Sequence, residues 1–421
     1  MFKSIIHTLG SKLSIGIINL LIAISISQYL GADAKGLQGL IIASMAYILI
    51  ISNIVGGASI VYLSPRNKLR HILAPSYLWA IIASTIAYFG LQWSSFIEAE
   101  YIPYVVLITL ISSITSINSS ILIGRENVHR SNIVATIQPA LCLLILLLFF
   151  FVLKRENIES YLYALLFSCL VALGLSTYYF FKLPHLKSES TLKRAFLDLF
   201  KYGILNQLSH IFQVLSFRLG YFWLAQVSTR AEVGVFSNAV SVIESIWILS
   251  RALSVVQYSK IVNSKNKIES QRITLQFSKI ASIASVIGCT VFALMPASFY
   301  TFIFGAEFSE MSNLIKLLSP GIVFFSVYII ISHYFSGTGR YDLNAWISLL
   351  GLSITIASLY TLSPIYGMIG VALSHMISYV ATAILAALLF YFRSNLTVSD
   401  LKITKGDINE LRANFKSLIR F

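Results

Sequence analysis

Residues 202–256 read YGILNQLSHIFQVLSFRLGYFWLAQVSTRAEVGVFSNAVSVIESIWILSRALSVV. Two long apolar segments, joined by the polar residues 226–232, carry three formal charges at Arg218, Glu244 and Arg251. A charged side chain at the centre of a membrane is costly, so it normally faces the interior of a helix bundle or a water-filled cavity. The stretch therefore predicts two membrane-spanning helices that form one wall of a substrate path.

Polar side chains of the first segment are predicted to share one helical face. At about 100° per residue, Asn206, Gln207, His210, Gln213 and Arg218 fall within an arc of about 140°, whereas Leu, Phe, Val and Tyr dominate the rest of the helix. We interpret this polar face as lining a cavity. Its members Asn206, His210, Gln213 and Arg218 are the predicted substrate-binding residues.

The second segment places a carboxylate and a guanidinium on one face. In a continuous helix, Glu244 and Arg251 lie about 10 Å apart along the axis. Arg251 is a further predicted substrate-binding residue, and Glu244 either forms a structural ion pair or carries a coupling ion. The alternative is that Arg218 and Arg251 extend to the two membrane interfaces, while Glu244 pairs with a neighbour inside the bundle.

Composition indicates a polytopic membrane protein, because 57% of the residues are apolar and only 11% are charged. Apolar runs of about 20 residues, each sufficient to cross a hydrocarbon core of about 30 Å, recur along nearly the whole chain. The predicted spans lie near residues 10–31, 37–63, 76–94, 103–123, 133–153, 160–181, 202–225, 233–256, 280–302, 312–334, 344–363 and 368–392. The predicted fold class is an all-α polytopic membrane protein with about twelve transmembrane helices.

Most of the 31 Lys and Arg residues lie on one side of these spans. The opposite side holds Lys35, Lys154, Arg155, Arg230 and Lys316. Positive residues mark cytoplasmic loops, so both termini are predicted to be cytoplasmic. The net charge of +14 is then explained by short loops that meet anionic lipid headgroups, and no nucleic-acid partner is expected.

An internal repeat divides the chain, because Gly39 at the start of the second span matches Gly234 at the start of the eighth. Gly-Arg pairs at 124–125 and 339–340 follow the fourth and tenth spans. The predicted domains are an N-terminal six-helix bundle at residues 1–181, a cytoplasmic linker with an interfacial helix at 182–201, a C-terminal six-helix bundle at 202–392, and a cytoplasmic amphipathic tail at 393–421.

Motifs of membrane enzymes are absent from the sequence. There is no Gly-rich phosphate loop, His-Glu-x-x-His, Cys-x-x-Cys or Gly-x-Ser-x-Gly. We therefore predict no catalytic residue, no metal site and no cofactor, and a protein that is not an enzyme. A polytopic polysaccharide polymerase or glycosyltransferase is an alternative, although the short outward loops disfavour a polymerase. A cation-coupled drug exporter is another, although the first span has no carboxylate before Asp33.

Three short turns marked by glycine carry a family resemblance. They read YLGADAKGL at 29–37, EVGVFSNA at 232–239 and YGMIGVAL at 366–373. Together with the arrangement of spans, short loops and a basic mid-chain loop, they resemble Wzx-type polysaccharide flippases of the multidrug/oligosaccharidyl-lipid/polysaccharide exporter superfamily. The multidrug/cation antiporters of the same superfamily are the alternative relatives.

The resemblance implies two bundles in a V shape around a central cavity, and alternating access of the two halves. It implies a flippase that carries undecaprenyl-pyrophosphate-linked oligosaccharide repeat units across the bacterial inner membrane, for O-antigen (lipopolysaccharide) or capsule biosynthesis. A polysaccharide polymerase and a chain-length regulator would be its partners. Where relatives often carry an acidic residue shortly after the arginine of the seventh span, this chain has Gly220, which leaves Arg218 to meet an anion. The forked guanidinium suits a pyrophosphate.

Overall fold

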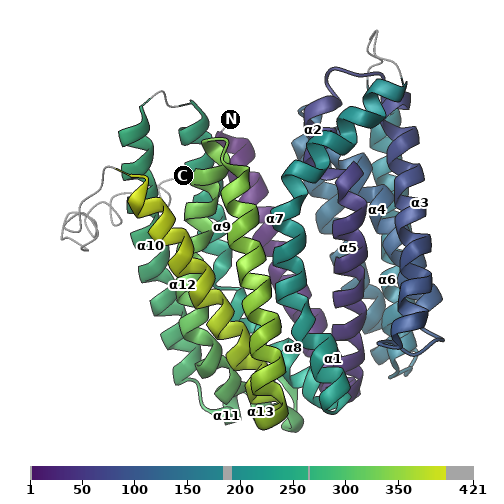
Figure 1. Cartoon of the computed structure of the whole chain (residues 1–421). Helices are drawn as coiled ribbons and strands as arrows, with labels where there is room; N and C mark the ends of the chain where they lie inside the picture. The colour runs from purple at the N-terminus through teal and green to yellow at the C-terminus, as the bar shows by residue number, and fades with distance from the viewer. Residues whose placement is uncertain (1, 184–191, 264–265, 395–421) are drawn as a thin grey trace. The chain divides into compact units, whose positions relative to one another are not determined.

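The computed structural model describes residues 2–183, 192–263 and 266–394, and throughout these ranges the regular elements are helical (Figure 1). In chain order they are α1 (Phe2–Ser52), η1 (Asn53–Val55), α2 (Gly57–Leu63), α3 (Leu69–Ser94), α4 (Ile102–Gly124), α5 (Val128–Leu147), η2 (Leu148–Val152), α6 (Ile158–Phe181), α7 (Leu192–Val227), α8 (Arg230–Glu244), α9 (Trp247–Asn263), α10 (Lys267–Leu294), α11 (Ala297–Phe304), η3 (Ala306–Phe308), α12 (Met311–Gly337) and α13 (Tyr341–Phe392). Most of the predicted cytoplasmic tail, from residue 395 on, lies outside the described residues.

Eight helical segments of the described chain are long and apolar enough to cross a membrane, or nine if α8 and α9 form one bent span. The longest, Gly10–Leu63 and Tyr341–Phe392, have 54 and 52 residues. Each is interrupted by a glycine with non-helical backbone angles, Gly31 in the first and Gly367 in the second. Because about 20 residues cross a bilayer core, each segment is long enough for two spans. The prediction of an all-α, multi-pass membrane protein is confirmed, and the number twelve stays a prediction.

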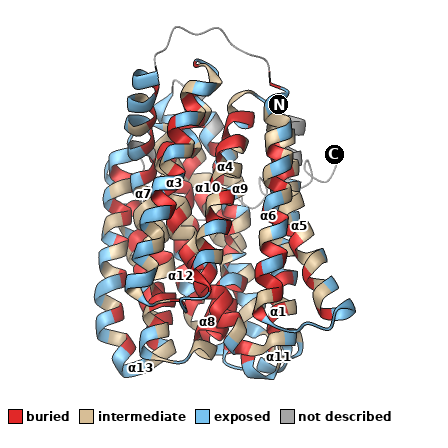
Figure 2. Cartoon of the chain, turned by 90° about the vertical axis from the view of Figure 1, so that its right-hand side faces the viewer, coloured by how far each residue is buried: buried red, intermediate tan, exposed pale blue. Residues whose placement is uncertain are grey.

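Burial follows the helix faces, with buried residues on one face and exposed residues on another (Figure 2). In α3, Ala80 and Ser84 are buried, whereas Ile86 and Phe89 are each 64% exposed. Large apolar side chains exposed along a helix are unfavourable in water but suit a surface that faces lipid tails.

Two compact units make up the chain. Unit 1 is formed by the chain up to Asn238 together with Ser298–Ser309, and unit 2 by Ala239–Ala297 together with the chain from Glu310 on. The chain therefore passes between the units within α8 and at both ends of Ser298–Ser309. The two predicted six-helix bundles divide the chain by its membrane spans, whereas these units divide it by contacts. The bundles therefore stay a prediction.

Residues 192–201 of the predicted linker form the first turns of α7. Ala195 and Leu199 are buried there, and Leu199 belongs to an apolar cluster of unit 1 with Ile72 of α3 and Ile121 of α4. The apolar face of this amphipathic run thus packs into the core of unit 1.

The loops of unit 1 gather into two groups, one at each end of α3 and α4. At one end, the Arg125 guanidinium donates to the carbonyl of Asn67 at 3.4 Å. At the other end, Arg230 forms ion pairs with Asp33 and with Glu98, each at 2.5 Å. This grouping agrees with the alternation of sides that the predicted spans require.

The break in α1 lies at Gly31, whose φ of 80° belongs to the left-handed region that favours glycine. Residues 298–309, which we call the capping segment, hold this break. The backbone N–H of Ala32 donates to Oε2 of Glu307 at 2.6 Å. The first N–H groups of a helix have no partner within it, so Glu307 caps the half of α1 that begins after Gly31.

In return, a side chain of α1 caps the C-terminal end of α11. Nε2 of Gln28, in the last turn before the break, donates to the carbonyls of Phe302 at 2.8 Å and Ile303 at 2.7 Å. These carbonyls belong to the final turn of α11, where intrahelical donors run out. Each of the two segments therefore satisfies the free backbone groups of the other.

Glu307→Ala is expected to lower the unfolding free energy by about 0.5–2 kcal/mol, the usual contribution of a side-chain cap. Glu307→Gln keeps an acceptor oxygen and should lose less. Thermal unfolding of the purified protein in detergent measures both. Glu310→Ala is the matched control, because the neighbour that this exposed carboxylate bonds within the described residues is Asn313, three positions on. Equal unfolding temperatures for Glu307→Ala and Glu310→Ala would contradict the capping role.

The second half of α1 packs closely against the start of α8. A Cβ at Gly36 would lie 1.9 Å from the carbonyl oxygen of Arg230, and a Cβ at Gly234 would lie 2.0 Å from that of Ala32. Gly39 faces α8 about one turn further on. Glycines allow two helix backbones to approach at such distances, as in many membrane helix pairs. The two glycines that marked the internal repeat, Gly39 and Gly234, thus lie at one helix contact.

Candidate substrate site

The predicted site residues lie on three helices. Asn206, His210, Gln213 and Arg218 are in α7 of unit 1, Glu244 ends α8 in unit 2, and Arg251 is in α9 of unit 2. The side chain of Asn206 lies outside what the structure describes. His210 is exposed, Gln213 is half-buried, and the neighbouring Gln207 is buried.

Arg218 is half-buried and is held against an aromatic side chain. Its Nη1 donates to the hydroxyl of Tyr221 at 3.0 Å, and its Cζ lies 5.3 Å from the centroid of that ring. Tyr221 is itself only 3% exposed. The hydrogen bond and the ring contact together orient the guanidinium, which carries five donors in a planar fork.

Lys35 is a buried cation that the prediction placed in an outward loop. The structure places it within α1, and only 3% of it is exposed. Its Nζ donates to Oε1 of Gln38 at 2.7 Å. Among the described residues, no carboxylate lies within 4 Å of this ammonium. The Arg218 guanidinium acts on it by electrostatic repulsion, so we refer to these two residues as the cation pair.

Sequence reasoning missed Lys35 because a charge between two apolar runs was taken to end a span. The signal that could have found it is Gly31, since a glycine break followed by Ala32 and Asp33 is a plausible helix start. From such a start, Lys35 falls in the first turn of a helix and not in a loop.

Glu244 joins a chain of buried polar groups in unit 2. Its Oε1 accepts a hydrogen bond from the hydroxyl of Tyr379 at 3.2 Å. Nδ1 of His375 lies 3.3 Å from the same hydroxyl. Tyr379 and His375 are 2% and 1% exposed. In the sequence, His375 resembles an isolated packing residue. Nothing in the local pattern connects it to Glu244, which lies 131 positions earlier.

Arg251 is exposed and lies over an aromatic ring, with its Cζ 5.9 Å from the centroid of Trp247. Within the described residues it forms no ion pair with Glu244. The prediction of one continuous helix through both residues was wrong, because α8 and α9 are bent by 43° at Ser245 and Ile246.

Local hydrogen bonding accounts for the bend. The N–H groups of Ser245 and Ile246 donate three residues back, to Val242 and Ile243, at 3.3 Å each. The Ser245 hydroxyl also donates to the Val242 carbonyl at 2.6 Å. Such a tightened turn, with a serine bonded to its own backbone, commonly bends a helix. Helical spacing therefore does not relate Glu244 to Arg251.

Comparisons with known proteins concern the fold. No family model matches the chain. The capsular polysaccharide biosynthesis protein CapF of Staphylococcus aureus is 24% identical over 252 residues, and the match covers 56% of this chain and 61% of CapF. The match thus spans less than two thirds of that relative.

Two solved structures cover most of the chain. An inward-facing multidrug resistance MATE family transporter of the MOP superfamily has a TM-score of 0.71 at 18% identity, covering 91% of this chain and 98% of its own. The lipid II flippase MurJ, in an inward closed conformation, has a TM-score of 0.73 at 17% identity, covering 95% and 89%. The chain has the fold of these transporters, which confirms the predicted resemblance at the level of the fold.

Proposed function

We propose that this protein is a flippase that moves undecaprenyl-pyrophosphate-linked oligosaccharide repeat units across the bacterial inner membrane for surface polysaccharide synthesis. The observation that carries the proposal is the cation pair, Lys35 and Arg218, inside unit 1. Two cationic groups close enough to repel each other also attract an anion. A pyrophosphate supplies that anion. The MurJ-like fold and the similarity to CapF support a lipid-linked glycan as the cargo.

The other parts of such a cargo suit the remaining residues. Asn206, His210 and Gln213 of α7 supply donors and acceptors for sugar hydroxyl groups. The lipid tail requires only apolar surface, which the lipid-facing helices offer. Translocation would follow from alternating access between the two halves of the chain.

A multidrug/cation antiporter is the second candidate, because the MATE transporter is as similar in fold as MurJ. The two functions differ in the charge of the cargo. The cation pair repels a cationic drug and attracts an anionic lipid. We therefore favour the flippase.

Reconstitution tests the proposal directly. The purified protein is placed in liposomes that contain a fluorescent undecaprenyl-pyrophosphate-linked oligosaccharide, and a membrane-impermeant reductant reports the fraction accessible from outside. Full accessibility with the protein, and half without it, is the expected result. Export of a cationic dye in the absence of lipid translocation would instead identify a drug exporter.

Glu244→Gln is expected to reduce lipid translocation to background while leaving the unfolding temperature unchanged. The amide oxygen still accepts from Tyr379, so the local structure is kept, but the side chain no longer carries a negative charge. The matched variant Tyr379→Phe removes the hydrogen bond and keeps the carboxylate, so it should retain translocation. Translocation by Glu244→Gln at the wild-type level, with no change in its response to a proton gradient, would assign Glu244 a structural role.

We also propose that both termini of the chain lie in the cytoplasm. A reporter that is active only outside the cytoplasm should be active when fused after Glu98 or Glu156, and inactive when fused after Arg194 or Lys405, because the loops rich in Lys and Arg stay inside. Reporter activity at Arg194 would reverse this assignment.

A further inference from the structure

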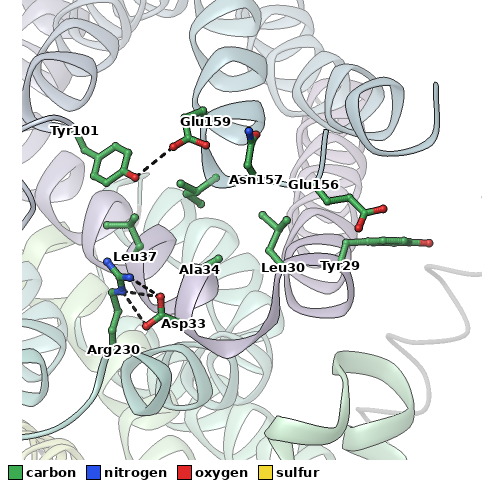
Figure 3. Close-up of a pocket in the computed structure, with 11 residues that line it drawn as sticks. Tyr29, Leu30, Asp33, Ala34, Leu37, Tyr101, Glu156, Asn157, Glu159 and Arg230 are labelled. Carbon is green, nitrogen blue, oxygen red and sulfur yellow. Dashed lines mark hydrogen bonds and ion pairs between the residues drawn. The ribbon is translucent and has the colours of Figure 1, made fainter. Parts of the chain in front are cut away.

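A cavity of about 340 Å³ lies in unit 1 beside the break in α1 (Figure 3). Its walls come from α1, from the start of α6, from Tyr101 before α4 and from Arg230 at the start of α8. Leu30 and Leu37 give it an apolar side, and Leu37 is only 3% exposed. The volume falls within the range of small-ligand sites, which is about 300–1,000 Å³.

The charge of this cavity is opposite to that of the cation pair. Its lining contains three carboxylates, Asp33, Glu156 and Glu159, and one guanidinium, Arg230. The positive charge of Arg230 is paired with two carboxylates. Its Nε lies 2.9 Å from both oxygens of Asp33, and its Nη1 lies 2.5 Å from Oε1 of Glu98. The cavity therefore has an excess of negative charge, and a phosphate or carboxylate ligand would be repelled.

Hydrogen-bonding groups face the cavity from two helix starts. Oδ1 of Asn157 accepts from the backbone N–H of Ser160 at 3.0 Å and so caps α6, which leaves its NH₂ group free of hydrogen bonds within the described residues. The Tyr101 hydroxyl donates to Oε1 of Glu159 at 3.4 Å. Burial, together with the nearby carboxylate of Glu159, raises the pKa of Tyr101 to about 12, so this hydroxyl stays a donor at any physiological pH.

The lining offers the groups that a neutral sugar uses. Hydroxyl groups of a sugar both donate and accept, so they can use carboxylate acceptors and an amide donor together. The ring carbons need an apolar wall, which Leu30 and Leu37 provide. A metal ion is less suitable, because no group of three or more His, Cys, Asp or Glu residues in the described chain is arranged to hold one.

We propose that the cavity between α1 and α6 binds a sugar residue that carries no acid group, as part of the glycan that the flippase delivers. The inference rests on the proposed function. The end of unit 1 that holds Asp33 and Arg230 is the end predicted to face outward, so the site would receive the glycan after translocation. Its negative charge would select the sugar end of the cargo over the pyrophosphate, which the cation pair binds.

Saturation-transfer NMR on the full chain in nanodiscs tests the site, with N,N′-diacetylchitobiose as the neutral probe and a disaccharide of N-acetylglucosamine and glucuronate as the acidic one. The neutral probe should give saturation transfer, and the acidic probe should bind at least about tenfold more weakly because of charge repulsion. Leu30→Trp, which fills the cavity, and Glu156→Ala, which removes an acceptor, should each weaken the neutral probe. Glu310→Ala, which removes an exposed carboxylate outside the lining, is the matched control and should change nothing.

The outcomes separate the cavity from the proposed function. Equal binding of both probes, or unchanged binding by Leu30→Trp with a wild-type unfolding temperature, would overturn the sugar site while leaving translocation untouched. Failure of the wild-type protein to translocate any lipid-linked glycan, with the neutral probe still bound in the cavity, would overturn the proposed function and leave the sugar site standing. Arg218→Ala should lose translocation and retain probe binding.

Discussion

Transport should fall to background when Arg218 is replaced by alanine. A pyrophosphate that enters the membrane without a cationic partner keeps a desolvation penalty of several kcal/mol per ion, which is enough to prevent its passage. Arg218→Lys should restore transport only in part, because a point charge cannot reproduce the two parallel bonds of a guanidinium. Arg251→Ala is expected to lose transport as well. Lipid translocation in liposomes, corrected for the amount of protein, measures all three.

The second cation supplies a control that separates binding from folding. Lys35→Met is expected to lose transport and to raise the unfolding temperature, since it removes a buried ammonium that has no carboxylate within 4 Å in the described part of the chain. A structural role would instead lower the unfolding temperature.

Wild-type glycan export by the double variant Arg218→Ala, Arg251→Ala, with normal protein abundance, would show that neither arginine binds the cargo.

Substitution of Gly234 should strongly impair folding. The Cβ of Gly234→Ala would lie 2.0 Å from the carbonyl of Ala32, so α1 and α8 must separate. Overpacking typically costs about 1–3 kcal/mol, out of a total stability of about 5–15 kcal/mol, and valine should cost more than alanine. We expect Gly234→Ala to reduce the amount of folded protein several-fold and Gly234→Val to abolish it, as measured by size-exclusion chromatography of a fluorescent fusion.

Two glycines elsewhere in unit 1 serve as matched controls. At Gly90 in α3 and Gly174 in α6, a Cβ would meet no atom within 4 Å among the described residues beyond the adjoining backbone of its own helix. Alanine at either site should be neutral or stabilising by about 0.5–1 kcal/mol, because glycine lowers helix stability. If Gly234→Ala accumulated as well as Gly174→Ala, the close contact between α1 and α8 would not limit folding.

The sequence was informative wherever a property repeats along the chain. Hydropathy located the membrane-spanning helices, because each one must be apolar over its whole length. The glycine motifs also had structural meaning, since Gly31 and Gly367 interrupt long helices and Gly234 permits a close contact. These features depend on local composition and backbone freedom, which one sequence displays.

Contacts between distant residues were not accessible in the same way. Gln28 and Glu307 take part in one contact although they are far apart in sequence, and no local pattern marks either of them as a cap. Lys35 was assigned to a loop because hydropathy treats any charge as an interruption. The bend at Ser245 was missed because neither proline nor glycine marks it. Hydrophobic periodicity therefore predicts one continuous helix where the structure has two, α8 and α9, joined by a tightened turn at Ser245.

The capping segment also imposes an order on biosynthesis. Ala32 and Glu307 are 275 residues apart. At about 5–20 residues per second, a ribosome needs on the order of 10–60 s to proceed from the first to the second. During that interval the N–H of Ala32 lacks its carboxylate, so the break in α1 is completed only after most of the protein has been inserted. A nascent chain that stops before residue 298 contains nearly all of unit 1 and still lacks the cap on its first helix. An unfinished chain therefore differs from a finished one in the uncapped N–H of Ala32.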